Sequence, residues 1–280
     1  MPRLRRLAIY PLAACLPALG LLLAFSPPAG ASTASHPSPR ARAIAALKQL
    51  KVGDHATNHA VGHGVKVNGL TQVRSLNWAG YADDNTAGNT YSTVTGNWSE
   101  PAVTCPSHGT QIAVFWVGID GFTSGTVEQD GTLAECNNGA ATYFSWWEMF
   151  PANSIQAVGS SVSPGDSISA SVVRSGSTYT LKLTDSTHPA NSFSTAQTCS
   201  TCANSSAEWI AEAPSSGGRI LPLPNFGTWT ETGATVNSGV ITSFPDDELT
   251  MVDNSGAVKA QPGPLNGSGN GFSVTWKRST

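Results

Sequence analysis

Short apolar runs separated by polar turn residues dominate the chain from residue 75 onward. Almost no segment there sustains the 3.6-residue repeat of a helix, whereas runs rich in β-branched and aromatic residues recur between Gly, Asn, Ser and Pro clusters. The clearest runs are QIAVFWVGI (111–119), ATYFSWWEMF (141–150), SISASVVRS (167–175), STYTLKLTD (177–185) and FSVTWK (272–277). Strands at this density predict a single all-β domain, an antiparallel sandwich or barrel.

Two glutamates are set among apolar residues in the stretch SAEWIAEAP, residues 206–214. Turn-forming residues bound it at both ends, which leaves room for a strand but hardly for a stable helix. Because side chains alternate along a strand, Glu208 and Glu212 are expected on one face, and Trp209 and Ala211 on the other. Both carboxylates then point to the same side of the sheet.

The first thirty-one residues have the pattern of a secretory signal peptide. Three arginines precede a long apolar run, which ends in the small residues Ala29-Gly30-Ala31, so cleavage is expected after Ala31. The alternative is an uncleaved membrane anchor, but the run is short for a bilayer span and two prolines interrupt it. We expect an exported, extracellular protein that does not act in a membrane.

Residues 32–74 differ in composition from the rest of the chain. They carry six basic residues against the single acid Asp54, together with four histidines, and the part RARAIAALKQLK (40–51) has the spacing of a short amphipathic helix. A disordered linker or a metal-binding histidine cluster are alternative interpretations. We interpret the segment as a propeptide that covers the acidic domain 75–280 by charge pairing and leaves when acid protonates the partner carboxylates.

The domain from residue 75 onward is acidic, with six basic residues against seventeen Asp and Glu, a formal net charge of −11 at neutral pH. When acid neutralises the carboxylates, few positive charges remain to repel one another, so we expect tolerance of acid. Many secreted Ser/Thr-rich β proteins share this composition. The lack of a basic face excludes nucleic-acid binding.

Four cysteines remain after Cys15 leaves with the signal peptide: Cys105, Cys136, Cys199 and Cys202. An even number in an oxidising compartment predicts two disulfides, and of three possible pairings we favour Cys105–Cys136 and Cys199–Cys202. The CSTC sequence could instead be a redox motif or half of a zinc site. However, no βαβ context supports the first and no second CxxC supports the second.

Three further stretches hold residues suited to chemistry. FWVGIDGFTSGTVEQDGT (115–132) carries Asp120 and Gln129, YFSWWEMFPA (143–152) places Glu148 beside Trp147, and NWAGYADD (77–84) offers Trp78. Aromatic side chains beside a groove suit extended polymer substrates, although they are also ordinary core residues.

Taken in order, NWAGYA, WVGIDG with QDG, WWEMFP and AEWIAE resemble the glutamic peptidases, also called eqolisins. The resemblance runs from about residue 77 to 212. It implies a secreted acid endopeptidase with a lectin-like (concanavalin-like) jelly-roll β-sandwich, acting on protein or peptide substrates without a cofactor or metal. It also assigns the catalytic carboxylate to Glu212 and the catalytic glutamine to Gln129.

The sequence departs from the family pattern in three places. The spacing from GIDG to the glutamine is one residue shorter than in the family. Glu128 or Asp130 could therefore occupy the position of the family's glutamine instead. A cysteine of the fungal members is replaced near Ser124, so the disulfides must differ. Met149 stands where the family has a tryptophan, which is expected to alter the substrate groove.

The implied chemistry is consistent with these residue types. A glutamate can deprotonate water in mild acid and return the proton to the leaving amine, while a neutral amide donates hydrogen bonds at any pH. Glu212 would transfer the proton, and Gln129 would stabilise the oxyanion. We expect Glu208 to be structural or to tune the pKa of its neighbour, Asp120 to support the site, and Trp78, Trp147 and Glu148 to contact substrate or support the pair.

The main rival is a secreted carbohydrate-active β-sandwich, either a glycoside hydrolase with two carboxylates or a sugar-binding module. A basic propeptide favours a peptidase zymogen instead. His108 and His188 lie in no recognisable serine-peptidase triad motif, and the chain has neither paired Asp-Thr/Ser-Gly sequences nor HExxH. We expect a monomer.

Overall fold

A computed structural model describes residues 44–52, 64–67, 70–159 and 161–280. The predicted signal peptide, residues 32–43 of the predicted propeptide and its four histidines lie outside the described residues. Within the described part almost every element is a strand, and no helix there is long and apolar enough to cross a membrane.

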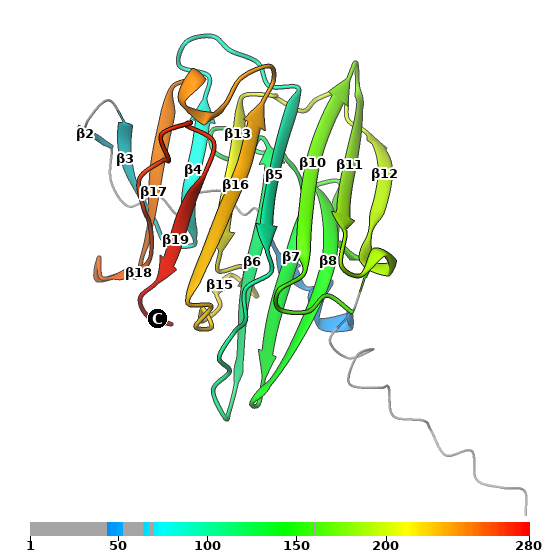
Figure 1. The fold of residues 1–280 in the computed structure, drawn as a ribbon, viewed down its shortest axis with the longest axis vertical. Helices are drawn as coiled ribbons and strands as arrows, with labels where there is room; N and C mark the ends of the chain where they lie inside the picture. Colours follow the sequence, from blue (N-terminus) through cyan, green and yellow to red (C-terminus); the bar gives the residue numbers. More distant parts are fainter. Residues whose placement is uncertain (1–43, 53–63, 68–69, 160) are drawn as a thin grey trace, which may run out of the picture. The chain divides into compact units, whose positions relative to one another are not determined.

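Five antiparallel strands form one layer of the molecule (Figure 1). They lie side by side in the order β12 (Phe193–Thr198), β11 (Thr178–Asp185), β10 (Ser167–Ser175), β5 (Thr93–Ser99) and β16 (Thr228–Val236). Inward and outward positions alternate in burial along β10 and β11, as expected of strands with one face on a core and one in water.

A second layer carries the motifs of the sequence analysis. Its strands follow the order β17 (Asp246–Val252), β4 (Trp78–Asp84), β13 (Ser206–Glu212), β6 (Thr110–Ile119), β7 (Val127–Asn137), β8 (Ala140–Phe150) and β9 (Asn153–Ala157). Residues of β13 and of the central parts of β6 and β7 are buried, because both faces of this layer are covered.

Strands β19 (Phe272–Trp276) and β18 (Val258–Pro262) join the layers, since β16 pairs with β19 and β18 is followed by β17. At the edge, β3 (Leu70–Ser75) runs parallel to β17 and pairs with β2 (Val65–Val67). A small separate sheet holds β1 (Leu50–Lys51), β14 (Ser215–Ser216) and β15 (Arg219–Ile220). Two 3₁₀ turns cover Pro189–Asn191 and Ile241–Ser243. The predicted antiparallel sandwich is confirmed.

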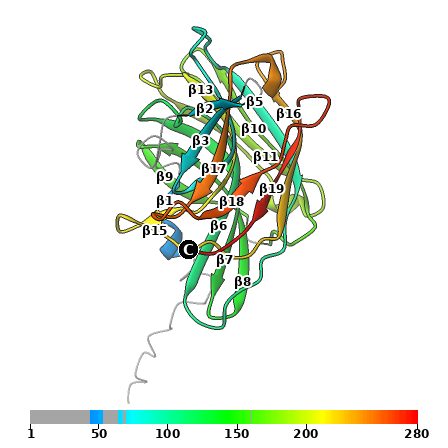
Figure 2. The same ribbon diagram turned by 90° about the vertical axis from the view of Figure 1, so that its left-hand side faces the viewer.

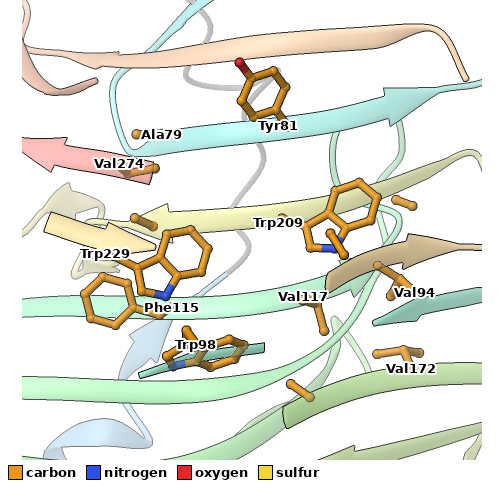
Figure 3. Close-up of a cluster of buried hydrophobic side chains, with 14 of the residues drawn as sticks. Ala79, Tyr81, Val94, Trp98, Phe115, Val117, Val172, Trp209, Trp229 and Val274 are labelled. Atoms are coloured by element: carbon orange, nitrogen blue, oxygen red, sulfur yellow. The ribbon is translucent and has the colours of Figure 1, made fainter. Parts of the chain in front are cut away.

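The main core lies between the two layers (Figure 3). Trp98 of β5, Phe115 of β6, Trp209 of β13 and Trp229 of β16 meet there, and the Phe115 and Trp229 rings stack with centroids 5.6 Å apart. Their strands β5, β6, β13 and β16 contact one another across the layers. This core holds the second layer in place from behind.

A second apolar cluster covers the opposite face of the β4–β13–β6–β7–β8 layer. It contains Trp78, Trp116 and Trp146 from the strands, and Leu47, Leu50 and Val52 from the N-terminal segment. The list is completed by Val73, Ala82, Ile112, Val114, Phe122, Val127, Leu133, Phe144, Ile155, Ile210 and Leu249. We call the side of the layer that carries this cluster the site face.

The predicted amphipathic helix is shorter than expected. Residues 44–47 are helical, but the chain then turns and Leu50–Lys51 extends as β1, which pairs with β14. Leu47 and Leu50 are buried against the site face. Burial of these side chains outweighs the local helix propensity that the sequence expresses.

Both favoured disulfides are confirmed. Cys105–Cys136 ties the chain before β6 to the end of β7, and Cys199–Cys202 closes a short loop between β12 and β13.

Candidate active site

Strand β13 presents its two glutamates on the site face. Ile210 belongs to the apolar cluster of that face, and the alternation of a strand puts Glu208 and Glu212 beside it, while Trp209 and Ala211 enter the core between the layers. The neighbouring strand β4 pairs with β13 along its whole length, and β6 pairs with it from Ala207 to Glu212. The expectation that the carboxylates share a face is therefore met, with both side chains buried.

Trp116 connects Glu212 to the neighbouring strands. Its indole N–H donates a hydrogen bond of 3.0 Å to Oε2 of Glu212, although 96 residues separate the two in the chain. Trp78 lies directly across from Glu212 on β4, and the Trp78 and Trp116 rings meet edge to face, 4.9 Å apart. The carboxylate is thus bonded to one buried indole and has a second on the neighbouring strand.

Gln129 lies on the same face, on β7, which is two strands away from β13. It is the cross-strand partner of Gly118 on β6, which in turn is the partner of Glu208 on β13. A side chain at Gly118 would come within 2.8 Å of the Trp116 ring and 3.1 Å of the Gln129 Cβ, so the indole lies over this glycine. The register therefore places Gln129, Gly118 and Glu208 in one row across the strands, with Glu212 four residues further along β13.

Glu148 of β8 orients the glutamine amide. The Gln129 Nε2 donates a 2.8 Å hydrogen bond to Oε2 of Glu148, its cross-strand partner. This hydrogen bond turns the amide nitrogen toward Glu148, so Oε1 of Gln129 faces elsewhere.

Several buried polar atoms on the site face have no hydrogen-bond partner among the described residues. They include Oε1 of Gln129, both carboxyl oxygens of Glu208 and the indole nitrogens of Trp78 and Trp146. Buried polar groups are nearly always paired in folded proteins, so such a group indicates a missing polar partner. Peptide N–H and C=O groups are partners of the required kind.

Asp120 organises the start of β13 from the end of β6. Its carboxylate accepts hydrogen bonds from the backbone N–H groups of Asn204 and Ser205 at 2.7 and 2.8 Å, and from the hydroxyls of Ser124, Thr126 and Ser205. The residue has a φ of +72°, a left-handed conformation that Asp tolerates better than most residues. Asp120 supports the strand that carries Glu212 and does not lie beside it.

The two residues considered as alternatives to Gln129, Glu128 and Asp130, lie on the face of β7 opposite the site face. Glu128 and Asp130 point toward the other layer, because they alternate with Val127 and Gln129. Burial, with the nearby Asp120 and Glu208 carboxylates, raises the pKa of Glu128 to about 10. Burial also raises the pKa of Asp130 and Glu208 well above the usual range. Neither Glu128 nor Asp130 is brought to Glu212.

Trp147 also departs from the expected arrangement. It packs against the core between the layers, on the opposite face from Glu148, whereas its neighbour Trp146 lies on the site face. Trp116 and Trp146 are site-face tryptophans that were not among the expected site residues. Alternation along β6 and β8 would have identified them, since each is two residues from a position on that face.

The site is covered by the chain's own N-terminal segment. Gln129, Glu212, Trp78 and Trp116 have no exposed surface. Strand β1 pairs with β14, three residues after Glu212, and it contacts β9 at the other end of the layer. Figure 2 shows β1, β9 and β15 on the same side of the molecule.

One cluster in the other layer has the donor types of a metal site. The carboxyls of Asp166 and Asp185 and the ring of His188 have ligand atoms within 4.8 Å of one another. The His188 Nδ1 lies 2.8 Å from Oδ1 of Asp166, and the backbone N–H groups of Thr187 and His188 donate hydrogen bonds to the Asp185 carboxylate. These groups already satisfy one another, and their loops do not reach the site face.

Comparison with known proteins assigns the family. Residues 76–261 match the model of the peptidase A4 family. Aspergillopepsin-2 of Aspergillus niger is 30% identical over 237 residues, covering 76% of this chain and 82% of the relative. Scytalidopepsin B of Scytalidium lignicola is 30% identical over 199 residues, covering 67% of this chain and 74% of the relative.

Solved structures of the same kind share the fold. Scytalido-glutamic peptidase with a peptide-based transition-state analogue superposes with a TM-score of 0.58 at 23% identity, covering 72% of this chain and 98% of that one. Aspergilloglutamic peptidase from Aspergillus niger gives a TM-score of 0.50 at 27% identity, over 60% and 99% of the two chains. The chain is a glutamic endopeptidase and belongs to the peptidase A4 (eqolisin) family.

Proposed function

We propose that the protein is an exported acid endopeptidase that cleaves peptide bonds with Glu212 and Gln129. One observation carries the assignment: both side chains are buried on the site face, where the Trp116 indole lies over Gly118, the cross-strand partner of Gln129, and donates a hydrogen bond to Glu212. Export rests on the signal-peptide pattern of residues 1–31.

In this proposal Glu212 acts as the general base. Its carboxylate, positioned by the Trp116 indole, takes a proton from a water molecule, and the oxygen of that water attacks the peptide carbonyl. The carbonyl becomes a tetrahedral oxyanion, toward which the second N–H of the Gln129 amide donates. The protonated Glu212 then gives its proton to the leaving amine, which regenerates the carboxylate.

We also propose that residues 32–74 form a propeptide whose part 44–52 closes the site. Leu47, Leu50 and Val52 are at most 5% exposed and belong to the cluster that contains Trp78 and Trp116. The contacts of this part are apolar, whereas the composition of the segment suggested charge pairing. A peptide substrate reaches Glu212 only after the segment leaves, which needs a cut between Val52 and Trp78.

Substitution of the pair tests the mechanism. Glu212→Gln preserves size but removes the base, so turnover should collapse while both disulfides form. Gln129→Ala should lower kcat on the order of a hundredfold or more, because one oxyanion donor is lost. Glu208→Gln is the matched control on the same strand and face, and it should cost far less. Peptide cleavage in mild acid is measured after the segment is cut at an engineered site, so that maturation does not limit the variants.

Near-normal turnover of Glu212→Gln, with an inactive Glu208→Gln, would contradict the assignment. Cleavage of protein by the wild type should survive both a chelator and an aspartic-peptidase inhibitor. Release of sugar from polysaccharide without proteolysis would instead support a glycoside hydrolase.

A further inference from the structure

A pocket of about 310 Å³ lies on the side of the molecule where β7 begins and β8 and β12 end. Its wall is formed by Glu128 and the chain around Phe150–Ala152, and by the loop from Thr198 to Cys202. Cys199 and Cys202, which form a disulfide, are both among the lining residues, and both are half-buried. This disulfide is therefore reachable from solvent through the pocket.

Glu128 lies beside this disulfide, and the Asp120 carboxyl is a further side-chain neighbour. A carboxyl oxygen of Glu128 and the two sulfurs lie within 4.8 Å of one another. The side chain has no exposed surface, and neither oxygen has a hydrogen-bond partner among the described residues. A carboxyl buried without a partner is costly, so a feature of this kind needs an explanation other than stability.

The surroundings keep this carboxyl protonated. Burial raises its pKa to about 10, and the Asp120 and Glu208 carboxylates act in the same direction, while Arg174 opposes them. Tyr179 is the other titratable group that interacts with it. At neutral and acid pH Glu128 is thus a neutral acid next to a disulfide, and it has a proton to give.

We propose that Cys199–Cys202 is a thiol–disulfide exchange site for small-molecule thiols, with Glu128 as the proton donor to the leaving sulfur. A thiolate entering the pocket attacks one sulfur, the S–S bond breaks and a mixed disulfide forms. The other sulfur leaves as a thiolate and takes the Glu128 proton. A second thiol returns a proton to Glu128 and, as thiolate, attacks the small-molecule sulfur of the mixed disulfide. The mixed S–S bond breaks, and the protein sulfur leaves as a thiolate that takes from water the proton that the first thiol had lost. Overall, two thiols are oxidised to a disulfide and the protein disulfide is reduced to two cysteines.

The sequence analysis found no context for a redox CSTC motif, because a partner carboxyl 71 residues before Cys199 is invisible in the spacing. The proposal is independent of the peptidase mechanism, since Glu128 faces away from Glu212.

The test measures the opening rate of each disulfide in the intact full-length protein. An acidic aromatic thiol, 4-mercaptobenzoate, is used at pH 6, where it still supplies thiolate, and new thiols are trapped with a maleimide and located by peptide mass spectrometry. Cys199–Cys202 should open at least about tenfold faster than Cys105–Cys136, whose Cys136 is fully buried. Glu128→Gln, of equal size and charge to the protonated acid, should slow the opening of Cys199–Cys202 by on the order of tenfold or more.

Glu100→Gln is the matched control, because Glu100 is also a buried glutamate with a raised pKa but does not line the pocket. It should leave both rates unchanged. An unchanged rate in Glu128→Gln, or equal rates for the two disulfides in the wild type, would overturn the proposal. If Glu128→Gln does not fold, the wild type in heavy water decides: slowing confined to Cys199–Cys202 supports proton donation, and equal slowing of both disulfides refutes it.

Discussion

At the scale of single residues, the amide of Gln129 is the group whose direction matters most. Its nitrogen is turned toward Glu148, so Oε1 and the second N–H are left for water and the oxyanion. A glutamine without such a neighbour would adopt both orientations of its amide, and only one presents the donor correctly. Glu148 is in this interpretation a positioning residue.

Replacing Glu148 by Gln should therefore lower kcat by up to about tenfold while KM changes little, because a hydrogen bond contributes roughly 0.5–1.5 kcal/mol. The new side chain can donate as well as accept, so it no longer distinguishes the two ends of the Gln129 amide. Steady-state kinetics on a peptide in mild acid provide the measurement. Asp130→Asn is the control, since Asp130 adjoins Gln129 on the other face of β7; an equal loss in both variants would point to a general structural effect.

At the scale of elements, the contact of β1 with the site face controls access. The segment 44–52 uses Leu47, Leu50 and Val52 as apolar anchors and adds a strand to β14 just after Glu212. Exposed Lys48 contributes no buried charge to this contact. Weakening an anchor should open the site without any cut in the chain.

Leu50→Ala should therefore raise the affinity of the uncut protein for a fluorescent peptide substrate about thirtyfold, because loss of a buried leucine costs roughly 2–5 kcal/mol. The measurement is made in a Glu212→Gln background, which removes self-maturation under the proposed mechanism. Val65→Ala serves as control, since Val65 also lies before the catalytic domain but is 69% exposed. Equal peptide binding by the parent and Leu50→Ala would show that the segment is not the cover.

At the scale of the whole molecule, buried carboxyls should make the folded protein more stable at acid pH than at neutral pH. Burial raises the pKa of Asp83 to about 10 and of Glu100 to about 8, and the pKa values of Asp246 and Asp247 rise to about 7. The folded state keeps these protons where the unfolded chain, with pKa values near 4, has lost them. Their contribution is complete below about pH 4 and is lost as pH rises through the folded-state values.

The unfolding temperature should fall between pH 4 and pH 8 by on the order of 10 °C, which calorimetry on the full chain can measure. Asp83 and Asp246 are cross-strand partners on β4 and β17, so their ionised forms repel directly. The double variant Asp83→Asn with Asp246→Asn should flatten the curve. Asp253→Asn should not flatten the curve, because hydrogen bonds from Ser255 and Ala257 lower the pKa of the Asp253 carboxylate. A wild-type curve that rises toward pH 8 would contradict the prediction.

The sequence by itself predicted the all-β fold, the shared face of Glu208 and Glu212 and, as the favoured one of three pairings, both disulfides. Alternation within SAEWIAEAP placed Glu208 and Glu212 together, because the two-residue period of a strand is local geometry. The four motifs in order also indicated the family and the Glu212 and Gln129 pair. The helix expected over 40–51 was wrong beyond residue 47, since local propensity says nothing about a remote apolar surface that draws the chain into an extended conformation.

Only the tertiary structure decided which faces meet. The register between β6, β7 and β13 is set by packing over long stretches of chain, so the hydrogen bond of Trp116 to Glu212 and that of Gln129 to Glu148 could not be read from spacing. The same register turned Glu128 away from the pair and toward a disulfide that follows 71 residues later. Sequence carries the period of each strand, whereas the relative shift of strands depends on which side chains fill the shared core.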